Sequence, residues 1–229
     1  MNAGFFLFHI FGYEWTHNRH VIKSMIANLL GRTERIIYAR DTYVSEEHSL
    51  EAVEFLRRNH RQGATYAKLR LGLRLKTTDE LVAVMTFNKM RSTMGRTADD
   101  EDENRMELSR FCTLCNTSVV GGASKLFKYF LAHSDCTQVI SFSDRAHTLG
   151  KLYNTLGFTC PITTSPGYVW VNTLTDEAKN RVQCQKRNLS VLFRDPDINI
   201  SEQTEQEIMM SHGYAQVFDA GLIRWTYNR

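Results

Sequence analysis

The sequence predicts an α/β protein with a mixed sheet flanked by helices, and three patterns support this prediction. Residues 107–158 follow the order strand, small-residue turn, helix, strand and helix. Residues 66–87 form two strand-like arms around a turn. Residues 16–30 have the three-four spacing of apolar side chains that is typical of an amphipathic helix. With 229 residues, 42% of them hydrophobic, the chain has ample material for a core.

The first elements are an apolar segment and a helix. Residues 5–11 are apolar, but this run is too short to span a bilayer and lacks a basic lead-in, so we expect a buried strand and no membrane segment. Thr16 is the expected cap of the helix that follows, and Gly31 is expected to end it.

Alternating strands and helices continue up to the central stretch. Residues 35–43 are predicted to form a strand, followed by a helix capped by Ser45 or Ser49. Residues 66–76 alternate apolar and basic side chains, which predicts a strand with one packed face, and residues 81–87 return as its partner.

Beyond the central stretch we expect shorter elements. The pattern predicts a strand over 168–171, a short helix over 202–210 capped by Ser201, and a final strand or hairpin over 217–227. The simplest organisation is one continuous domain with a core over about 35–172 and a C-terminal extension over about 173–229.

Composition restricts the location and the class of the protein. The odd number of five cysteines, at scattered spacing, indicates a reduced cytoplasmic environment. Cys112 and Cys115 form a single CxxC motif. This motif is compatible with a zinc site or with two buried thiols. The net charge of +3 with a pI near 8.6 is only mildly basic, so the distribution of charge has to decide whether nucleic acid binds.

That distribution is strongly uneven. Seven Lys or Arg residues and no acid occur between positions 57 and 76, with His60 and Tyr66 among them, and Lys89, Arg91 and Arg96 extend the run. Such a segment is typical of phosphate contact, although a solvated basic hairpin would have the same composition. Lys68, Arg70, Arg74 and Lys76 share parity along the strand, which predicts that they line one face. The seven residues are Arg57, Arg58, Arg61, Lys68, Arg70, Arg74 and Lys76.

A turn of small residues is the most informative feature of the central stretch. Gly121, Gly122 and Ala123 lack bulk, so several backbone N–H groups can converge where a helix begins, a geometry that holds a pyrophosphate or another anion. Lys125 adds positive charge, and Ser124 could bind phosphate or cap the helix.

This turn resembles the coenzyme A-binding turn of the Gcn5-related N-acetyltransferases, which has the pattern Gln/Arg-x-x-Gly-x-Gly/Ala. Residues 118–123 (SVVGGA) keep the small residues, with Ser118 in the place of Gln or Arg. The resemblance implies an acetyltransferase-like mixed sheet, a donor such as acetyl-CoA or another acyl-type compound, and contacts to it from Val120 to Lys125. It also implies a general acid at Tyr153, four residues before the Gly157-Phe158 pair.

Within that superfamily the chain resembles the Mom-type DNA-modification proteins of Mu-like phages. The motifs are ELSRFC, VVGGASKLFKYF, SFSDR and EQEIMMSHGYAQVFDAG, and the likeness extends from about residue 36 to 227. It implies conversion of adenine in double-stranded DNA to its N6-carbamoylmethyl form, which protects phage DNA from host restriction enzymes. We therefore expect activity in the host cell cytoplasm, and a homodimer is a candidate assembly.

This reaction class adds one expectation and leaves the donor open. An adenine inside a duplex cannot reach a pocket, so we expect the base to be flipped and stacked on Tyr43 or Tyr66. The product joins nitrogen to a CH₂ carbon, whereas transfer from acetyl-CoA gives an amide. Either the donor differs from a plain acyl thioester, or a second step or a redox-active metal rearranges the acyl unit.

Four side chains are the candidate catalytic residues: Tyr153, Asp144, Arg110 and Ser124. Tyr153 could protonate a leaving group or, with a lowered pKa, ligate a metal, although a packing role would place it on the same helix. Asp144 follows a strand, where sheet enzymes place active groups, and could take a proton from the adenine amine. Its alternative role is to cap a helix over 146–155. Arg110 requires a partner, for which Asp144, Glu107 and a substrate are candidates.

His48 is the candidate metal ligand, with Tyr153 as a candidate partner. Imidazole, phenolate and carboxylate ligands suit iron or manganese, and iron is the metal that we expect if one is bound. The alternative for His48 is an exposed histidine at the start of a helix. The acidic run at 99–103 is interpreted as a solvated loop or as a guard that repels DNA.

Two other functions are compatible with the sequence. An acetyl-CoA-dependent N-acetyltransferase acting on a non-DNA acceptor would not need the basic segment. A non-catalytic DNA-recognition module would bind DNA even after loss of Tyr153 and Asp144.

Overall fold

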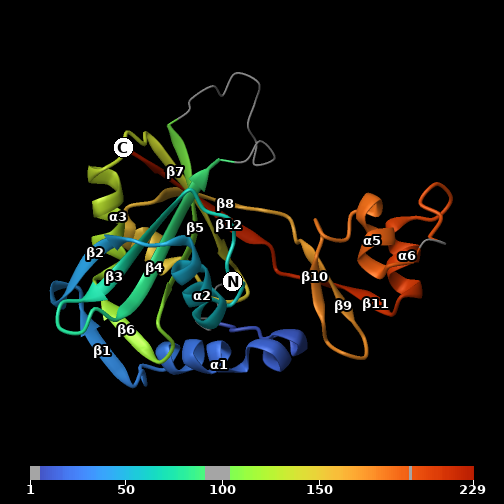
Figure 1. Ribbon diagram of the computed structural model, residues 1–229, viewed down its shortest axis with the longest axis horizontal. Coiled ribbons are helices and arrows are strands. Elements are labelled where there is room, and N and C mark those ends of the chain that lie inside the picture. The colour runs from blue at the N-terminus through green and yellow to red at the C-terminus, as the bar shows by residue number, and fades with distance from the viewer. Residues whose placement is uncertain (1–5, 91–103, 196–197) are drawn as a thin grey trace. The chain divides into compact units, whose positions relative to one another are not determined.

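The computed structural model describes residues 6–90, 104–195 and 198–229, which form two compact units (Figure 1). The larger unit consists of His20–Ser143, Thr148–Thr163 and Ile223–Arg229. The smaller unit consists of the N-terminal residues up to Arg19, the segment Asp144–His147 and the segment Thr164–Leu222. The expected C-terminal extension is therefore mostly an insertion, because the last strand returns to the sheet of the larger unit.

The larger unit is built on a seven-stranded mixed sheet. Its strands, in sheet order, are β2 (Thr42–Glu46), β3 (Leu69–Leu75), β4 (Leu81–Lys89), β5 (Arg105–Thr113), β7 (Gln138–Asp144), β12 (Leu222–Asn228) and β8 (Thr159–Thr163). The pairs β2–β3, β3–β4, β4–β5 and β12–β8 are antiparallel, whereas β5 and β7 are parallel. This confirms the predicted fold class, an α/β protein with a mixed sheet flanked by helices.

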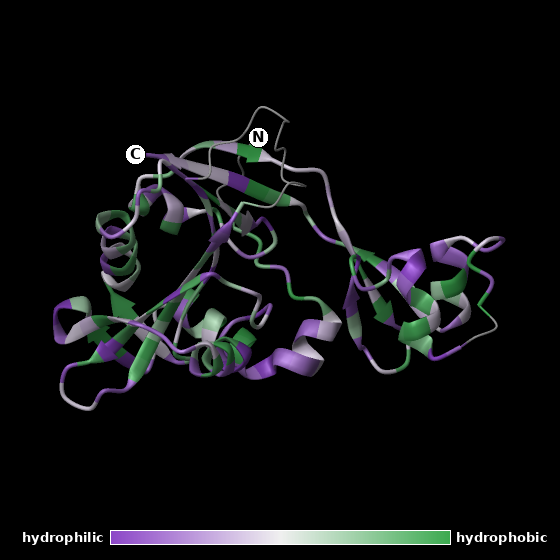
Figure 2. Ribbon diagram, turned by 45° about the horizontal axis from the view of Figure 1, so that its top comes forward, coloured by the Kyte–Doolittle hydropathy of each residue, from purple (hydrophilic) through white to green (hydrophobic). Residues whose placement is uncertain are grey.

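Helices pack on both faces of the sheet. They are α2 (Ser49–Asn59), α3 (Gly122–Ala132) and α4 (Lys151–Leu156). Phe87 of β4 stacks on Phe130 of α3 with ring centroids 3.7 Å apart, whereas Val84 belongs to the cluster formed with Phe55 of α2. Side chains of β4 thus point alternately to the cluster under α3 and to the cluster under α2. Figure 2 shows hydrophobic residues along these central strands.

The predicted strand over 35–43 is divided into two strands in different sheets. β1 (Arg35–Tyr38) pairs in parallel with β6 (Thr117–Val120), and β2 begins only at Thr42. A 3-10 turn, Ala39–Asp41, separates the two strands. The hydroxyl of Thr42 donates to the carbonyl of Ala39 at 2.8 Å, which closes this turn.

The prediction of an N-terminal strand over 5–11 is wrong for its described part. Residues 6–11 have no strand pairing, and the helix α1 (Gly12–Leu29) begins directly after them. The carboxylate of Glu14 accepts a hydrogen bond from the backbone N–H of Phe11 at 3.1 Å, so the apolar segment leads into the helix. Apolar composition alone could not distinguish a strand from an ordered non-regular segment.

The smaller unit has its own sheet and its own core. β9 (Tyr168–Asn172) lies between β10 (Ala178–Asn180) and β11 (Tyr214–Phe218), and the short helices are α5 (Leu189–Phe193) and α6 (Glu205–Ser211). Trp170, Leu189, Ile208 and Met209 are almost completely buried together. The predicted cap Ser201 is replaced by Thr204, which forms a capping box with Glu207.

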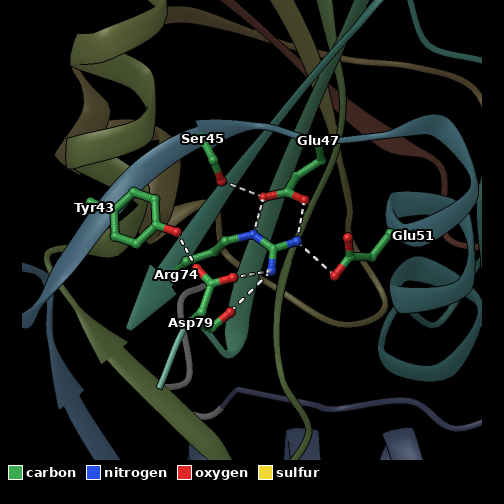
Figure 3. Close-up of polar contacts among 6 residues, drawn as sticks. All are labelled: Tyr43, Ser45, Glu47, Glu51, Arg74 and Asp79. Carbon is green, nitrogen blue, oxygen red and sulfur yellow. Dashed lines mark hydrogen bonds and ion pairs between the residues drawn. The ribbon is translucent and has the colours of Figure 1, made fainter. Parts of the chain in front are cut away.

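A largely covered arginine on β3, Arg74, joins the residue after β2 to helix α2 in the larger unit (Figure 3). Arg74 contacts both carboxylate oxygens of Glu47, at 2.9 and 2.6 Å, and lies 2.6 Å from Glu51 and 3.6 Å from Asp79. The side chain of Glu47 is 2% exposed, and a Cβ at Gly72 would collide with it. Glycine at position 72 therefore makes room for this ion pair.

We predict that Glu47→Ala lowers the free energy of unfolding by roughly 3 kcal/mol, at the lower end of the range for a broken buried pair because Glu51 and Asp79 remain beside Arg74. Urea denaturation measures this loss. The matched control is Glu51→Ala, whose half-exposed carboxylate should contribute less than about 1 kcal/mol. Equal losses for both variants would contradict the assignment of Glu47 as the principal partner.

Candidate active site

The two parallel strands at the centre of the larger unit pair over only part of their length. Arg105, Met106 and Glu107 are in register with residues 138–140. One residue further on, the carbonyl of Leu108 accepts a hydrogen bond from the Ser141 hydroxyl at 2.8 Å. A side chain thus continues the contact where the described ladder ends, and both strands run on from there toward their carboxyl ends, where sheet enzymes bind their ligands.

Tyr153 of α4 binds β7 at the same point. Its hydroxyl donates to the carbonyl of Phe142 at 3.0 Å and lies 3.1 Å from the Ser141 hydroxyl. Its ring stacks on Trp225 at 5.5 Å. Burial raises the pKa of Tyr153, although the hydrogen bond from Ser141 and the charge of Arg110 act in the opposite direction. The phenol therefore stays protonated at neutral pH, which suits a proton donor better than a phenolate metal ligand.

Arg110 of β5 lies near Tyr153, so the structure brings two of the predicted catalytic residues together. The guanidinium donates to the carbonyl of Gly63 at 3.3 Å and to that of Ser109 at 2.7 Å. Burial is the main cause of the raised pKa of Tyr153 and of the lowered pKa of His60, and the charge of Arg110 opposes the first shift and adds to the second. Arg110 therefore supplies positive potential at the tyrosine.

The predicted anion-binding turn begins helix α3. Gly121 precedes the helix with φ at +77°, a conformation that favours glycine, and Gly122 is its first residue. A Cβ at Gly122 would lie 2.8 Å from Val119, so close packing also requires the second glycine. The first N–H groups of an α-helix have no partner within the helix, which leaves donors at this turn for an anion. Val120 is half-exposed beside it, and Ala123 and Ser124 occupy the first helical turn.

Lys125 has a structural contact in addition to its expected role. Its ammonium group donates to the carbonyls of Ala39 (2.8 Å) and Thr42, which ties α3 to the 3-10 turn. Burial lowers the pKa of Lys125, and the charge of Lys76 lowers it further. The amine therefore contributes positive potential near the turn from a position fixed by carbonyl groups.

Asp144 ends β7 and belongs to the smaller unit. The predicted helix over 146–155 begins only at Lys151, with Gly150 as its cap, so the proposed capping role for Asp144 is wrong. One Asp144 oxygen accepts from the backbone N–H of Ala146 at 2.9 Å, and the other lies 3.3 Å from His147. Asp144 therefore organises a turn rather than a helix.

The basic side chains of β3 do not form one free surface. Leu71 and Leu73 lie in the main core and Leu69 and Leu75 pack against it, so the basic residues of the same strand share the opposite parity, as predicted. Arg74, however, is sequestered by its carboxylate partners, and Arg70 donates to the carbonyl of Ala67.

An exposed group nevertheless remains at one end of the β3–β4 pair. Tyr66 is 76% exposed, and Lys68 and Lys89 are exposed as well. Tyr43, the other predicted stacking residue, is less exposed, and its hydroxyl is bound by Asp79. Tyr66 is therefore the more accessible aromatic side chain of the two.

The remaining residues of the predicted DNA contact lie at the end of α2 and the segment after it. Arg57 and Arg58 are exposed, and Arg58 pairs with Glu54 at 2.6 Å. Arg61 is half-buried. Burial lowers the pKa of His60 to about 3, with Arg110 and Arg61 contributing, so His60 is neutral at pH 7 and cannot attract phosphate by charge. Arg91 and Arg96, like the acidic run at 99–103, lie outside the described residues.

No group of three or more His, Cys, Asp or Glu side chains that could hold a metal occurs within residues 6–90, 104–195 and 198–229. His48 is exposed and precedes α2 without a side-chain cap, whereas Tyr153 is buried. Cys112 and Cys115 are free thiols, and burial raises the pKa of both. The described residues thus do not form a fitting iron site, and the role of His48 stays a prediction. Over the same part of the chain, no helix has the length and apolar character needed to cross a membrane.

Three residues of this site were missed by the sequence analysis. Ser141 and Trp225 contact Tyr153, and Gly150 leaves the space that the Trp225 ring occupies, because a Cβ there would approach it to 2.0 Å. A serine on a strand and a distant tryptophan carry no local signal. The isolated Gly150 in front of an apolar helix was the one detectable clue.

Comparison with solved structures finds acetyltransferases. A GNAT-family acetyltransferase from Bacillus cereus is 13% identical over 82% of this chain and 97% of its own, with a TM-score of 0.39. An IAA acetyltransferase, also from Bacillus cereus, is 12% identical over 82% of this chain and 99% of its own, with a TM-score of 0.43. No protein-family model matches the chain. No curated protein matches it either.

We predict that Tyr153→Phe lowers the free energy of unfolding by about 1–2 kcal/mol, because the Phe142 carbonyl and the Ser141 hydroxyl lose a buried partner while the ring packing is retained. Urea denaturation tests this, with the exposed Tyr66→Phe as a control that should unfold like the unaltered protein. An unchanged stability of Tyr153→Phe would show that its hydroxyl does not help to hold α4 on β7.

Proposed function

We propose that this protein is an acyl-type transferase that modifies adenine in double-stranded DNA, giving the N6-carbamoylmethyl base and protecting phage DNA from host restriction. The observation that carries the proposal is the turn at Gly121 and Gly122, which opens α3 in the same unit as a protonated tyrosine and an arginine. The particular base and product come from the Mom-type resemblance of the sequence.

The donor would be held at the start of α3. Backbone N–H groups of residues 122–124 suit a pyrophosphate, and the fixed ammonium of Lys125 adds favourable potential. A phosphorylated donor such as acetyl-CoA, or another acyl-type compound, has the group that this turn recognises. Direct transfer from acetyl-CoA would form an amide at the adenine nitrogen. The N6-carbamoylmethyl product instead requires a donor that delivers a CH₂ carbon bearing the carboxamide, with the leaving group departing from that carbon as the N–C bond forms.

Tyr153 and Asp144 are the proposed proton-handling residues. The raised pKa of Tyr153 keeps a proton on the phenol, which fits a general acid for a leaving group. Asp144 is 16% exposed at its side chain and has both oxygens oriented by neighbours, which fits a carboxylate that receives the proton of an attacking amine.

The acceptor would be DNA that contacts the exposed end of β3 and β4. Lys68 and Lys89 supply phosphate contacts there, and Tyr66 offers an exposed aromatic surface beside them. Arg57 and Arg58 extend the positive surface at the end of α2.

We predict that plasmid DNA from bacteria that express this protein contains an adenine nucleoside heavier by one carbamoylmethyl group, and that Tyr153→Phe lowers its amount at least tenfold because the general acid is lost. Mass spectrometry of digested nucleosides measures both. Equal soluble expression is the control for folding. Unmodified DNA from cells that contain the soluble protein would contradict the proposed reaction.

We further predict that removing both Lys68 and Lys89 by alanine substitution weakens duplex binding and lowers the slope of log affinity against log salt by about 1.8, since each phosphate contact contributes roughly 0.9. Fluorescence anisotropy over a salt series measures the slope. Lys128→Ala, an exposed lysine of α3, is the matched control and should leave it unchanged. An unaltered slope in the double variant would place the DNA elsewhere.

A further inference from the structure

The smaller unit contains a cavity of about 310 Å³ that the site described so far does not use. It is lined by the N-terminal segment, the residues after β7 and the end of β11. Its apolar, aromatic and charged lining includes Leu7, His9, Phe11, Arg145, Phe218 and Asp219.

The cavity has aromatic and aliphatic side chains that are only partly covered. Phe218 is 59% exposed and Leu7 is 79% exposed, although both belong to its lining. Phe11 packs against His9 at 4.3 Å between ring centroids and stacks on Tyr13 at 5.5 Å, so these two rings fix the position of its ring. Large apolar side chains exposed around one concavity indicate a ligand with an apolar face.

Two charged side chains of the lining are held in fixed positions. One oxygen of Asp219 accepts hydrogen bonds from the backbone N–H groups of Gly167 and Gly221, both at 2.7 Å. Arg145 donates to the carbonyl of Ala220 at 2.9 Å. Gly221 has φ at +79°, and a Cβ there would lie 2.6 Å from a backbone oxygen, so this turn requires glycine. The second oxygen of Asp219 is a preorganised acceptor.

One wall of the cavity is braced by buried ionisable groups. Ala146 lines the cavity, and its carbonyl accepts from the backbone N–H of His9 at 2.9 Å. The neighbouring His147, 3% exposed at its side chain, lies 3.4 Å from Glu14 and 3.3 Å from Asp144, which are ion-pair distances. Three buried or nearly buried ionisable side chains thus fix the segment 144–147 that carries both the wall and Asp144.

We propose that this cavity binds a single nucleobase that carries an exocyclic amine. The base stacks on Phe218 and Phe11, its amine donates to Asp219, and Arg145 donates to a ring nitrogen or carbonyl oxygen. The volume lies at the lower end of the range for ligand pockets, which suits one base rather than a whole coenzyme. A purely apolar ligand would desolvate the second Asp219 oxygen and the remaining guanidinium N–H groups of Arg145 without replacing their hydrogen bonds to water.

The inference rests on the proposed function, which requires that a base leaves the duplex. The chain then holds the extruded base in a pocket whose wall includes the two residues that follow Asp144. The base that the proposed function implies is adenine, whose exocyclic amine would donate to Asp219.

The test uses 9-methyladenine as the probe and ligand-observed NMR with the full chain. We expect binding to weaken about tenfold for Phe218→Ala, through loss of stacking, and for Asp219→Asn, whose amide keeps the two backbone contacts but replaces the free acceptor by a donor. 9-Methylpurine, which lacks the amine, should also bind about tenfold more weakly. Leu174→Ala, an exposed apolar side chain in the same unit, is the control and should bind normally.

The outcomes separate this inference from the function on which it rests. Binding of 9-methyladenine that is insensitive to both substitutions, or equal binding of 9-methylpurine, overturns the pocket assignment even if plasmid DNA carries the modified adenine. Binding that both substitutions weaken, together with unmodified DNA, keeps the pocket and removes the proposed reaction. Thermal unfolding of each variant shows whether it is folded when binding is lost.

Discussion

The partial pairing of β5 with β7 is the constraint on which the larger unit depends. Two parallel strands that share only residues 105–107 and 138–140 in the described register need another contact to stay together. Ser141 of β7 provides it through the carbonyl of Leu108 on β5. Tyr153 of α4 binds Ser141 and the carbonyl of Phe142, both on β7, and stacks on Trp225 of β12. The candidate general acid is therefore also a structural tie, so activity and stability are coupled in the same hydroxyl group.

This coupling explains why loss of activity at Tyr153 is ambiguous by itself. A tyrosine buried for packing and a tyrosine buried to hold a proton have the same location and the same raised pKa. What distinguishes them is the neighbouring charge. Arg110 stabilises an ionised phenol, which a packing residue does not require, and its position on β5 next to the end of the ladder favours a chemical role. Measuring both the free energy of unfolding and the amount of modified adenine for Tyr153→Phe therefore distinguishes a packing role from a chemical role.

The sequence predicted the sheet, the turn and the central helices, because periodicity and glycine placement are local signals. It did not predict that residues 35–43 divide between two sheets, since the break at Ala39–Asp41 is held by Lys125 from a distant helix. It also did not predict the ion pairs of Arg74. The alternation of side chains along one strand does not show that Glu47 and Glu51, which come from another segment, lie beside this arginine. Charge counted along a chain cannot distinguish a phosphate contact from an internal ion pair.

The same limit applied to the site in the smaller unit. Asp144 was found because it ends a strand, but Glu14, which lies beside its neighbour His147, and the cavity residues Phe11 and Asp219 come from segments far apart in the sequence. Burying three ionisable groups around one turn costs free energy that a simple connection would not need. A fixed turn is useful when the residues on it must meet a ligand in one geometry. The energetic cost at 144–147 is thus best explained by a ligand that the neighbouring cavity receives.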